Sequence, residues 1–138
     1  MEQKEKELLL KDLCARLPYG VKCKYSHIQY IENGEIIDIN RFGRVNINGH
    51  IKDICDIKPY LFPLSSMTEE QYYELQNCSS DDCLEHMELV KTLRECTDFT
   101  HWPLYEYRVI DWLNKNHFDY RGLIPMGLAI DATGLNIY

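Results

Sequence analysis

Apolar residues near the start of the chain recur at three- and four-residue steps, which is the spacing of one face of an α-helix. The stripe within residues 5–17 consists of Leu9 or Leu10, Leu13, Cys14 and Leu17. Pro18 follows directly and cannot continue a helix. The charged residues between the apolar ones alternate in sign, so we expect them to form a solvated face. The pattern predicts an amphipathic N-terminal helix.

Between residues 20 and 53 the apolar period shortens to two, which is typical of strands. Asn33-Gly34 lies between two β-rich runs and is the favoured sequence of a two-residue type I′ turn. The pair predicts a hairpin over residues 28–39. Its register places one apolar set on a shared face, which we expect to be buried: Ile28, Tyr30, Ile37 and Ile39.

Two more strands flank the predicted hairpin. Before it, residues 21–25 alternate lysines with an apolar side formed by Val21, Cys23 and Tyr25. After it, residues 44–48 point Val45 and Ile47 inward, and Asn48-Gly49 forms a turn that leads to Ile51 and Ile54. Short strands joined by tight turns predict a four- or five-stranded antiparallel meander, either a small curled sheet or a partial barrel.

The second half of the chain returns to helical spacing. Residues 59–64 contain two prolines, and we expect an extended connector there. The capping-box spacing then occurs twice, in Ser66 with Glu69 and in Thr68 with Gln71, and predicts a helix through about Gln76. Residues 79–82 can cap another helix that runs to about Cys96.

A last helix is predicted after Pro103, on an apolar stripe formed by Tyr105, Val109, Trp112 and Leu113. Asp119 can cap a turn over residues 120–124, and Pro125 ends that turn. Several apolar residues follow the cap: Leu123, Ile124, Met126, Leu128 and Ile130. We expect this tail to close the core.

These elements predict an α+β fold: an N-terminal helix, the antiparallel meander, and a C-terminal helical half packed on it. A chain of 138 residues suits a single domain, 1–138. Within it, residues 1–58 would form a helix plus β-meander lobe and residues 59–138 a helical lobe. We expect one common interior, which would contain Ile28, Ile37, Trp112 and Leu123.

Charge and composition narrow the function classes. The net charge is −7, and residues 61–100 carry the excess of acid, which disfavours binding of nucleic acid by the whole molecule. No apolar run is long enough to cross a bilayer, and the N-terminus lacks the apolar core of a secretion signal. We therefore expect a cytoplasmic protein with no membrane partner, whose six cysteines are free thiols.

Basic and aromatic residues in the first half could form a ligand-binding surface on the sheet, as small barrels use charge and stacking to bind nucleotides or single strands. The candidates there are Lys22, Lys24, Tyr25, Arg41 and Arg44, with Phe42 among them. Tyr120 and Arg121 offer a second corner beside a predicted turn. The alternative interpretation is a solvated outer face with scattered tyrosines.

Two groups of residues carry potential chemistry. Zinc-ligand types occur at Cys78, Cys83, His86 and Cys96, but their spacing is not that of a zinc knuckle, and we expect neither metal nor cofactor. His117 and Asp119 form a possible acid–base pair. No nucleophile motif or phosphate loop accompanies them, and Asp119 already has a capping role, so we do not expect an enzyme.

Three blocks extend over much of the chain: residues 8–22 (LLLKDLCARLPYGVK), 57–71 (IKPYLFPLSSMTEEQ) and 118–129 (FDYRGLIPMGLA). They resemble a group of small uncharacterised proteins encoded by gut anaerobic bacteria of the Bacteroides type and by their phages and prophages. The resemblance implies a phage or prophage accessory protein in the host cell cytoplasm. It assigns no functional residues and does not extend to residues 28–39.

These observations favour a non-enzymatic binding protein of phage or prophage origin. By analogy with phage accessory proteins, it would counter host defence by sequestering a nucleotide-like immune signal or by gripping a host protein. The alternative is a small nucleic-acid-binding regulator that uses the basic face of the sheet, and an enzyme using His117 and Asp119 is a third hypothesis. An uncovered sheet edge is also compatible with a homo-oligomer.

Overall fold

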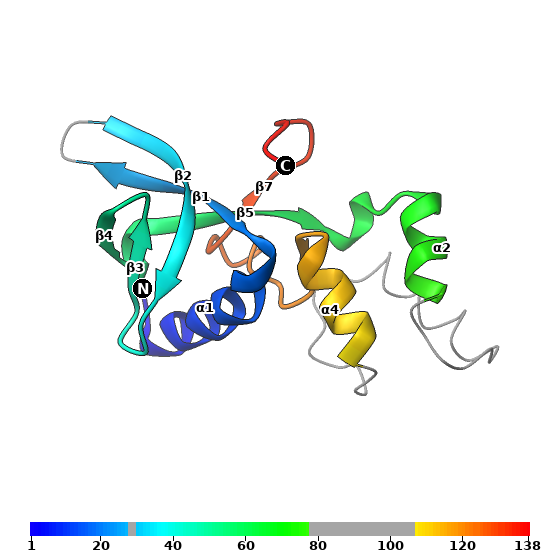
Figure 1. Ribbon diagram of the computed structural model, residues 1–138, viewed down its shortest axis with the longest axis horizontal. Coiled ribbons are helices and arrows are strands. Elements are labelled where there is room, and N and C mark those ends of the chain that lie inside the picture. The colour runs from blue at the N-terminus through cyan, green and yellow to red at the C-terminus, as the bar shows by residue number, and fades with distance from the viewer. Residues whose placement is uncertain (28–29, 78–106) are drawn as a thin grey trace.

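The computed structural model describes residues 1–27, 30–77 and 107–138 and has the predicted α+β architecture (Figure 1). The elements in chain order are α1 (Gln3–Arg16), β1 (Val21–His27), β2 (Tyr30–Ile39), β3 (Arg44–Ile47), β4 (His50–Asp53), β5 (Ile57–Pro63), α2 (Glu69–Asn77), α4 (Tyr107–Lys115), β6 (Phe118–Asp119) and β7 (Ile130–Asp131). The helix predicted over residues 79–96 lies outside the described residues.

The strands form an open sheet in the order β4-β3-β2-β1-β5-β6, and β7 also pairs with β5. Strands β1 to β4 are the predicted antiparallel meander. β5 then returns beside β1, antiparallel to it, while β6 and β7 run parallel to β5. Helix α1 lies on one side of this sheet, and the last residues of the chain, after β7, lie on the other (Figure 1). The sheet therefore has an inner face on α1 and an outer face.

The inner face follows from alternation along β1 and β3. The inward residues of both strands are buried, as predicted: Val21, Cys23, Tyr25, Val45 and Ile47. The Asn48-Gly49 turn between β3 and β4 is also confirmed, with φ of 51° and 91° at its two residues. Ile54 is buried after this turn, whereas Ile51 is 60% exposed.

The hairpin predicted around Asn33-Gly34 is wrong. These two residues lie inside β2, where Asn33 pairs with Lys24 and Gly34 with Cys23. The strand runs straight through them, so the predicted buried face does not form. Tyr30 and Ile37 are each 56% exposed, Ile39 is half-buried, and Ile28 lies outside the described residues. Ile36, which pairs with Val21, faces the core instead.

Gly34 is needed for close packing and not for a turn. A Cβ at this position would lie 2.5 Å from Cγ2 of Ile47 and 3.0 Å from Cε1 of Tyr25. Both neighbours are buried, so neither can easily move away. The register of β2 on β3 shifts between Ile36 and Asp38, which leaves Ile37 as an extra residue pointing to solvent. Glycine therefore lets β3 curl over β2.

The Gly34→Ala variant should lose roughly 1–3 kcal/mol of unfolding free energy, because the added methyl group overpacks against Ile47. Removal of Cγ2 in Ile47→Ala should reduce the cost of Gly34→Ala when both changes are combined. Urea denaturation of the four proteins in this double-mutant cycle measures the coupling. Additive costs would contradict the packing explanation and would favour a conformational role for the glycine.

β5 occupies the place where an extended connector was predicted, and this prediction is wrong. The strand is paired on both sides and buries Ile57, Pro59, Tyr60 and Leu61. Pro59 is tolerated because its nitrogen points away from β1. The carbonyl of Tyr60 faces β1, whereas the carbonyl of Leu61 accepts from Ala132 beside β7, and successive residues alternate in this way. Two prolines therefore did not prevent a central strand.

In the described part of the chain, two separate clusters replace the single predicted interior. The first packs α1 against the inner face of the sheet and includes Leu9, Leu13 and Leu123. The second gathers Trp112 and Leu113 of α4 with Phe118, Leu64, Met67 and Leu75. The planes of the Trp112 and Phe118 rings lie 10° apart, with centroids 5.6 Å apart. Trp112 and Leu123 thus belong to different clusters, and Ile37 belongs to neither.

Local capping agrees in part with the predictions. Thr68 and Gln71 form the reciprocal capping box that starts α2, with hydrogen bonds of 3.0 and 3.2 Å. Ser66 makes no such box and donates to the carbonyl of Pro63. Asp119 caps the following turn as predicted, since its carboxylate accepts from the backbone N–H groups of Leu123 and Ile124.

The charged side of α1 is not all solvated, contrary to the prediction. Asp12 and Arg16 are both fully buried and form an ion pair of 2.7 Å. Arg121 approaches the other carboxylate oxygen of Asp12 at 3.1 Å. Arg16 also donates to the carbonyl of Phe118 at 2.6 Å and lies over the ring of Tyr120. One turn of the helix is therefore fixed to β6 and the loop after it.

Asp12→Ala should cost about 3–5 kcal/mol of unfolding free energy, because it leaves the buried guanidinium of Arg16 without a counter-charge. The matched control, Asp111→Ala, removes an exposed carboxylate from α4 and should change stability by about 0.5 kcal/mol or less. Chemical denaturation of both variants tests this. Equal effects of the two substitutions would show that the buried pair does not hold the fold.

Candidate ligand-binding site

The outer face of the sheet carries the polar half of the β1 alternation. Lys22, Lys24 and Ser26 point to this side, because Val21, Cys23 and Tyr25 between them are buried. On the neighbouring strand β5, Lys58 pairs directly with Lys24. Two lysines from strands distant in sequence are therefore brought side by side on the same face.

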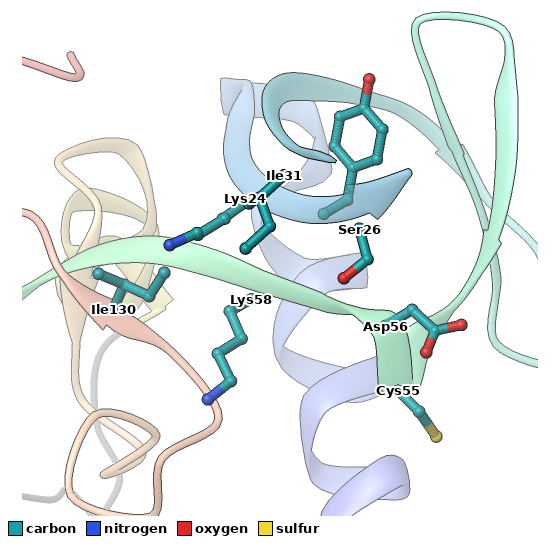
Figure 2. A pocket seen from close by; sticks show the side chains of 8 residues that line it. Lys24, Ser26, Ile31, Cys55, Asp56, Lys58 and Ile130 are labelled. Atoms are coloured by element: carbon teal, nitrogen blue, oxygen red, sulfur yellow. The ribbon is translucent and has the colours of Figure 1, made fainter. Parts of the chain in front are cut away.

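The Lys24–Lys58 pocket is a hollow of about 380 Å³ at this position. It is lined by Lys24, Tyr25, Ser26, Ile31, Cys55, Asp56, Lys58 and Ile130. Figure 2 shows the two lysine side chains extending toward the side where β7 carries Ile130, while Cys55 and Asp56 point the other way. The pocket therefore has a cationic part formed by the two lysines, next to the apolar Ile130. Its other end carries one carboxylate, that of Asp56.

Neither ammonium group in this pocket has a partner among the described residues: no hydrogen bond, ion pair or ring contact engages Lys24 or Lys58. Like charges directly opposite one another on antiparallel strands repel. The pocket holds two cationic side chains against one carboxylate, that of Asp56. An anion bound between the lysines would remove this repulsion.

Two other hollows are electrically balanced. One, of about 390 Å³, sets Arg41 and Lys6 against Glu7 and Asp53 near α1. The other, of about 310 Å³, lies on the outer face and sets Lys22 against Glu35 beside Asn136 and Ile137. Neither has an excess of positive charge. The Lys24–Lys58 pocket is thus the better anion site of the three.

A hydrogen bond between a buried and an exposed side chain links two strands on the outer face. The hydroxyl of Tyr60 on β5 donates to the side-chain oxygen of Asn33 on β2 at 2.6 Å, across the intervening strand β1. Asn33 pairs with Lys24 in register. The Asn33–Tyr60 bond therefore ties β2 to β5 next to Lys24.

The seven residues predicted to bind a ligand do not come together. Lys22 and Lys24 share the outer face of β1, whereas Tyr25 is buried on the opposite side and its hydroxyl donates to Glu32. This hydrogen bond raises the pKa of Tyr25 to about 12. Tyr25 borders the pocket without offering its hydroxyl to a ligand.

Arg41 and Arg44 lie near the far end of β2. Asn40 there bonds to the backbone of Arg44, and Asn40 is seven residues from Asn33, which pairs with Lys24. At ~3.3 Å per strand residue, this separation is roughly 20 Å along β2. Arg41 packs over the ring of Phe42, and Arg44 pairs in register with Asp53. The basic residues therefore form two separate groups.

Tyr120 and Arg121, the second predicted corner, belong to the buried Asp12 cluster. Arg121 binds Asp12, and the hydroxyl of Tyr120 donates to Asn114 at 2.7 Å. The polar groups of Tyr120 and Arg121 are therefore already bound to other residues of the protein. Sequence reasoning missed Lys58, Ser26 and Ile130, because only the pairing of β5 with β1 and β7 brings them to Lys24.

The predicted acid–base pair, His117 and Asp119, takes part in structural contacts. Both oxygens of Asp119 accept backbone hydrogen bonds, and burial raises the pKa of its carboxyl group. The ring of His117 stacks on Tyr138 with centroids 3.5 Å apart, and burial lowers the pKa of His117 to about 4, with Arg16 and Lys22 adding to the effect. Neither group faces the Lys24–Lys58 pocket.

His117 should make stability depend on pH. The unfolded imidazole has its usual pKa of 6.5 and the folded one about 4, so only the unfolded chain takes up this proton in between. The free energy of unfolding should fall as the pH drops from about 6.5 to about 4. His117→Asn suits the left-handed φ of 63° and should flatten this slope in urea titrations, whereas an unchanged slope would refute the assignment.

The described residues contain no group of three or more His, Cys, Asp or Glu side chains placed to hold a metal ion. The zinc-ligand types named from the sequence, Cys78, Cys83, His86 and Cys96, lie outside those residues. Of the described thiols, Cys14 and Cys55 are exposed and Cys23 is buried. Burial raises the pKa of Cys23 to about 12, so this thiol stays protonated at neutral pH.

Within residues 1–27, 30–77 and 107–138, the structure contains no helix with the length and apolar character of a membrane span. Comparisons of the chain with protein-family models, curated proteins and solved structures give no match.

Proposed function

We propose that this protein is a non-enzymatic binding protein that holds a small anionic ligand, of the nucleotide type, in the Lys24–Lys58 pocket. The observation that carries the proposal is the pair of unpartnered ammonium groups on neighbouring positions of β1 and β5. Lysine is a common ligand for phosphate, and its hydrogen bonds to charged oxygens are stronger than neutral ones. A phosphate group between the two lysines would satisfy both.

The other walls of the pocket support a ligand larger than a free anion. A volume of about 380 Å³ falls within the usual range for small-molecule sites. Ile31 and Ile130 supply apolar surface, and Ile31 is 61% exposed without such a ligand. The Ser26 hydroxyl and the Asp56 carboxylate are available for hydrogen bonds to a ribose or a base. This mixture suits a nucleotide better than inorganic phosphate.

The biological setting is a proposal that follows from the resemblance of three sequence blocks to small proteins of Bacteroides-type bacteria and their phages. A phage or prophage protein that binds a nucleotide-like ligand in the host cytoplasm could sequester an immune signal. Gripping a host protein is the alternative form of the same counter-defence role. The pocket favours the first, because its unpartnered charges are concentrated in a concave site.

A nucleic-acid-binding regulator has weaker support from the geometry. Such a protein needs a continuous basic surface along which the phosphate backbone can run. Here the lysines of β1 and β5 are separated from Arg41 and Arg44, and an acidic residue, Glu35, lies opposite Lys22 in the strand register. The separation favours a compact ligand.

The test is a titration of the protein with pyrophosphate, AMP, ADP, and cyclic and linear dinucleotides, followed by thermal shift and calorimetry. At least one probe should raise the melting temperature. Lys24→Gln combined with Lys58→Gln should weaken its binding by about a hundredfold or more, since two charge-assisted hydrogen bonds worth ~1.5–3 kcal/mol each are lost. The matched control is Lys4→Gln with Lys11→Gln, which removes the same charge from exposed positions on α1.

Absence of binding by every probe, or an equal loss in the pocket and control variants, would overturn the proposal. Salt-sensitive binding of short oligonucleotides, lost on Lys24→Ala with Arg44→Ala, would support the regulator in its place.

A further inference from the structure

The segment of residues 135–138 lies against the outer face of the sheet and engages the third lysine of that face. The ammonium group of Lys22 donates to the carbonyl of Ile137 at 2.8 Å and lies 5.7 Å from the centre of the Tyr138 ring. Lys22 and Lys24 are two residues apart on the same face of β1, so their side chains start roughly 7 Å apart. The segment thus engages the cation nearest to Lys24 along the outer side of β1.

Tyr138 also fills a gap in the strand ladder. β1 and β5 pair from Cys23–Pro59 to Tyr25–Ile57, and the ladder stops before Lys22 and Tyr60. The Lys22 N–H donates to the Tyr138 hydroxyl at 3.0 Å, and that hydroxyl donates to the Tyr60 carbonyl at 2.9 Å. The phenol group therefore acts as an inserted rung. It satisfies two backbone groups that the diverging strands leave unpaired.

Other features of the segment favour release without loss of the core. Leu135 is 50% exposed and Tyr138 is 41% exposed, and Asn136 and Gly134 both have positive φ, as in a turn. Neither core cluster includes any residue beyond Ala129. The segment is held through Lys22 and Tyr60, through ring contacts of Tyr138 with His117 and Phe62, and through a hydrogen bond of 3.1 Å from the Leu135 N–H to the carbonyl of Ala132.

We infer that residues 135–138 form an autoinhibitory strap, which competes with an anionic ligand for Lys22. This inference rests on the proposed function. With the strap in place, the ligand meets two ammonium groups, and with the strap displaced it meets three. A ligand with two separated acidic groups, such as a nucleoside diphosphate or a dinucleotide, gains most, because one group can bind Lys24 and Lys58 while the other binds Lys22. Its differential affinity then shifts the strap toward the open state.

Tyr138→Ala removes the ring and the inserted rung, and should tighten the binding of ADP by about tenfold or more, which is the gain expected from one freed charge-assisted contact. AMP, whose single phosphate group stays between Lys24 and Lys58, should gain less. In a Lys22→Gln background, the gain from Tyr138→Ala should vanish. Tyr138→Phe, which keeps the ring, should give a smaller gain and guards against loss of folding in the alanine variant.

Hydrogen exchange supplies a readout that needs no ligand. The Lys22 amide should be protected in the wild-type protein and exchange faster in Tyr138→Phe, since the rung is lost. Unchanged exchange would overturn the strap. Binding of ADP that depends on Lys24 and Lys58 but is unaffected by Tyr138→Ala would overturn the inference and leave the proposed function intact. If no variant binds any probe, both the strap and the proposed function are overturned. Faster exchange of the Lys22 amide in Tyr138→Phe would then show only that the Tyr138 hydroxyl forms the inserted rung.

Discussion

The buried ion pair between Asp12 and Arg16 is the interaction on which the arrangement of the described elements depends. Arg16 lies on α1, yet it binds the carbonyl of Phe118 and lies over the ring of Tyr120, more than a hundred residues later in the chain. Asp12 also binds Arg121. Burial of charge is costly unless the charges are paired and hydrogen-bonded, so this cluster favours one geometry between the helix and the segment after β6. It thereby fixes the last part of the chain against the first.

That constraint determines what the two faces of the sheet can do. α1 and residues 123–129 cover the inner face, where β1 contributes Val21, Cys23 and Tyr25. The lysines between these residues must then point outward. β5 adds Lys58 to the same face, and the short parallel pairing with β7 places Ile130 beside it. A cationic pocket with an apolar wall is thus a by-product of packing on the other side of the same strand.

The alternation of β1 and β3, the Asn48-Gly49 turn, the N-terminal helix and the Thr68–Gln71 cap were all predictable, because each depends on contacts or dihedral angles within a few residues. Asn33-Gly34 misled the prediction for a physical reason. Its local preference for a turn is weaker than the gain from continuous pairing of β2 with β1, and the glycine is required by Ile47 of another strand. Pro59 and Pro63 misled in the same way. A proline is excluded from a strand only where its missing N–H would have bonded, and at Pro59 that side faces away from β1.

By itself, the sequence determined the fold class, the existence of the meander and the outward direction of Lys22 and Lys24, since period and turn chemistry are local properties. Only the tertiary structure decided which strands neighbour each other, and with that which charged groups of the described residues meet a partner. Lys58 became part of a pocket because β5 returned beside β1, whereas Arg121 was withdrawn from any ligand because Asp12 met it in the core. Pairing between distant segments depends on the total burial and on the satisfaction of all polar groups at once, and no short stretch of residues contains that information.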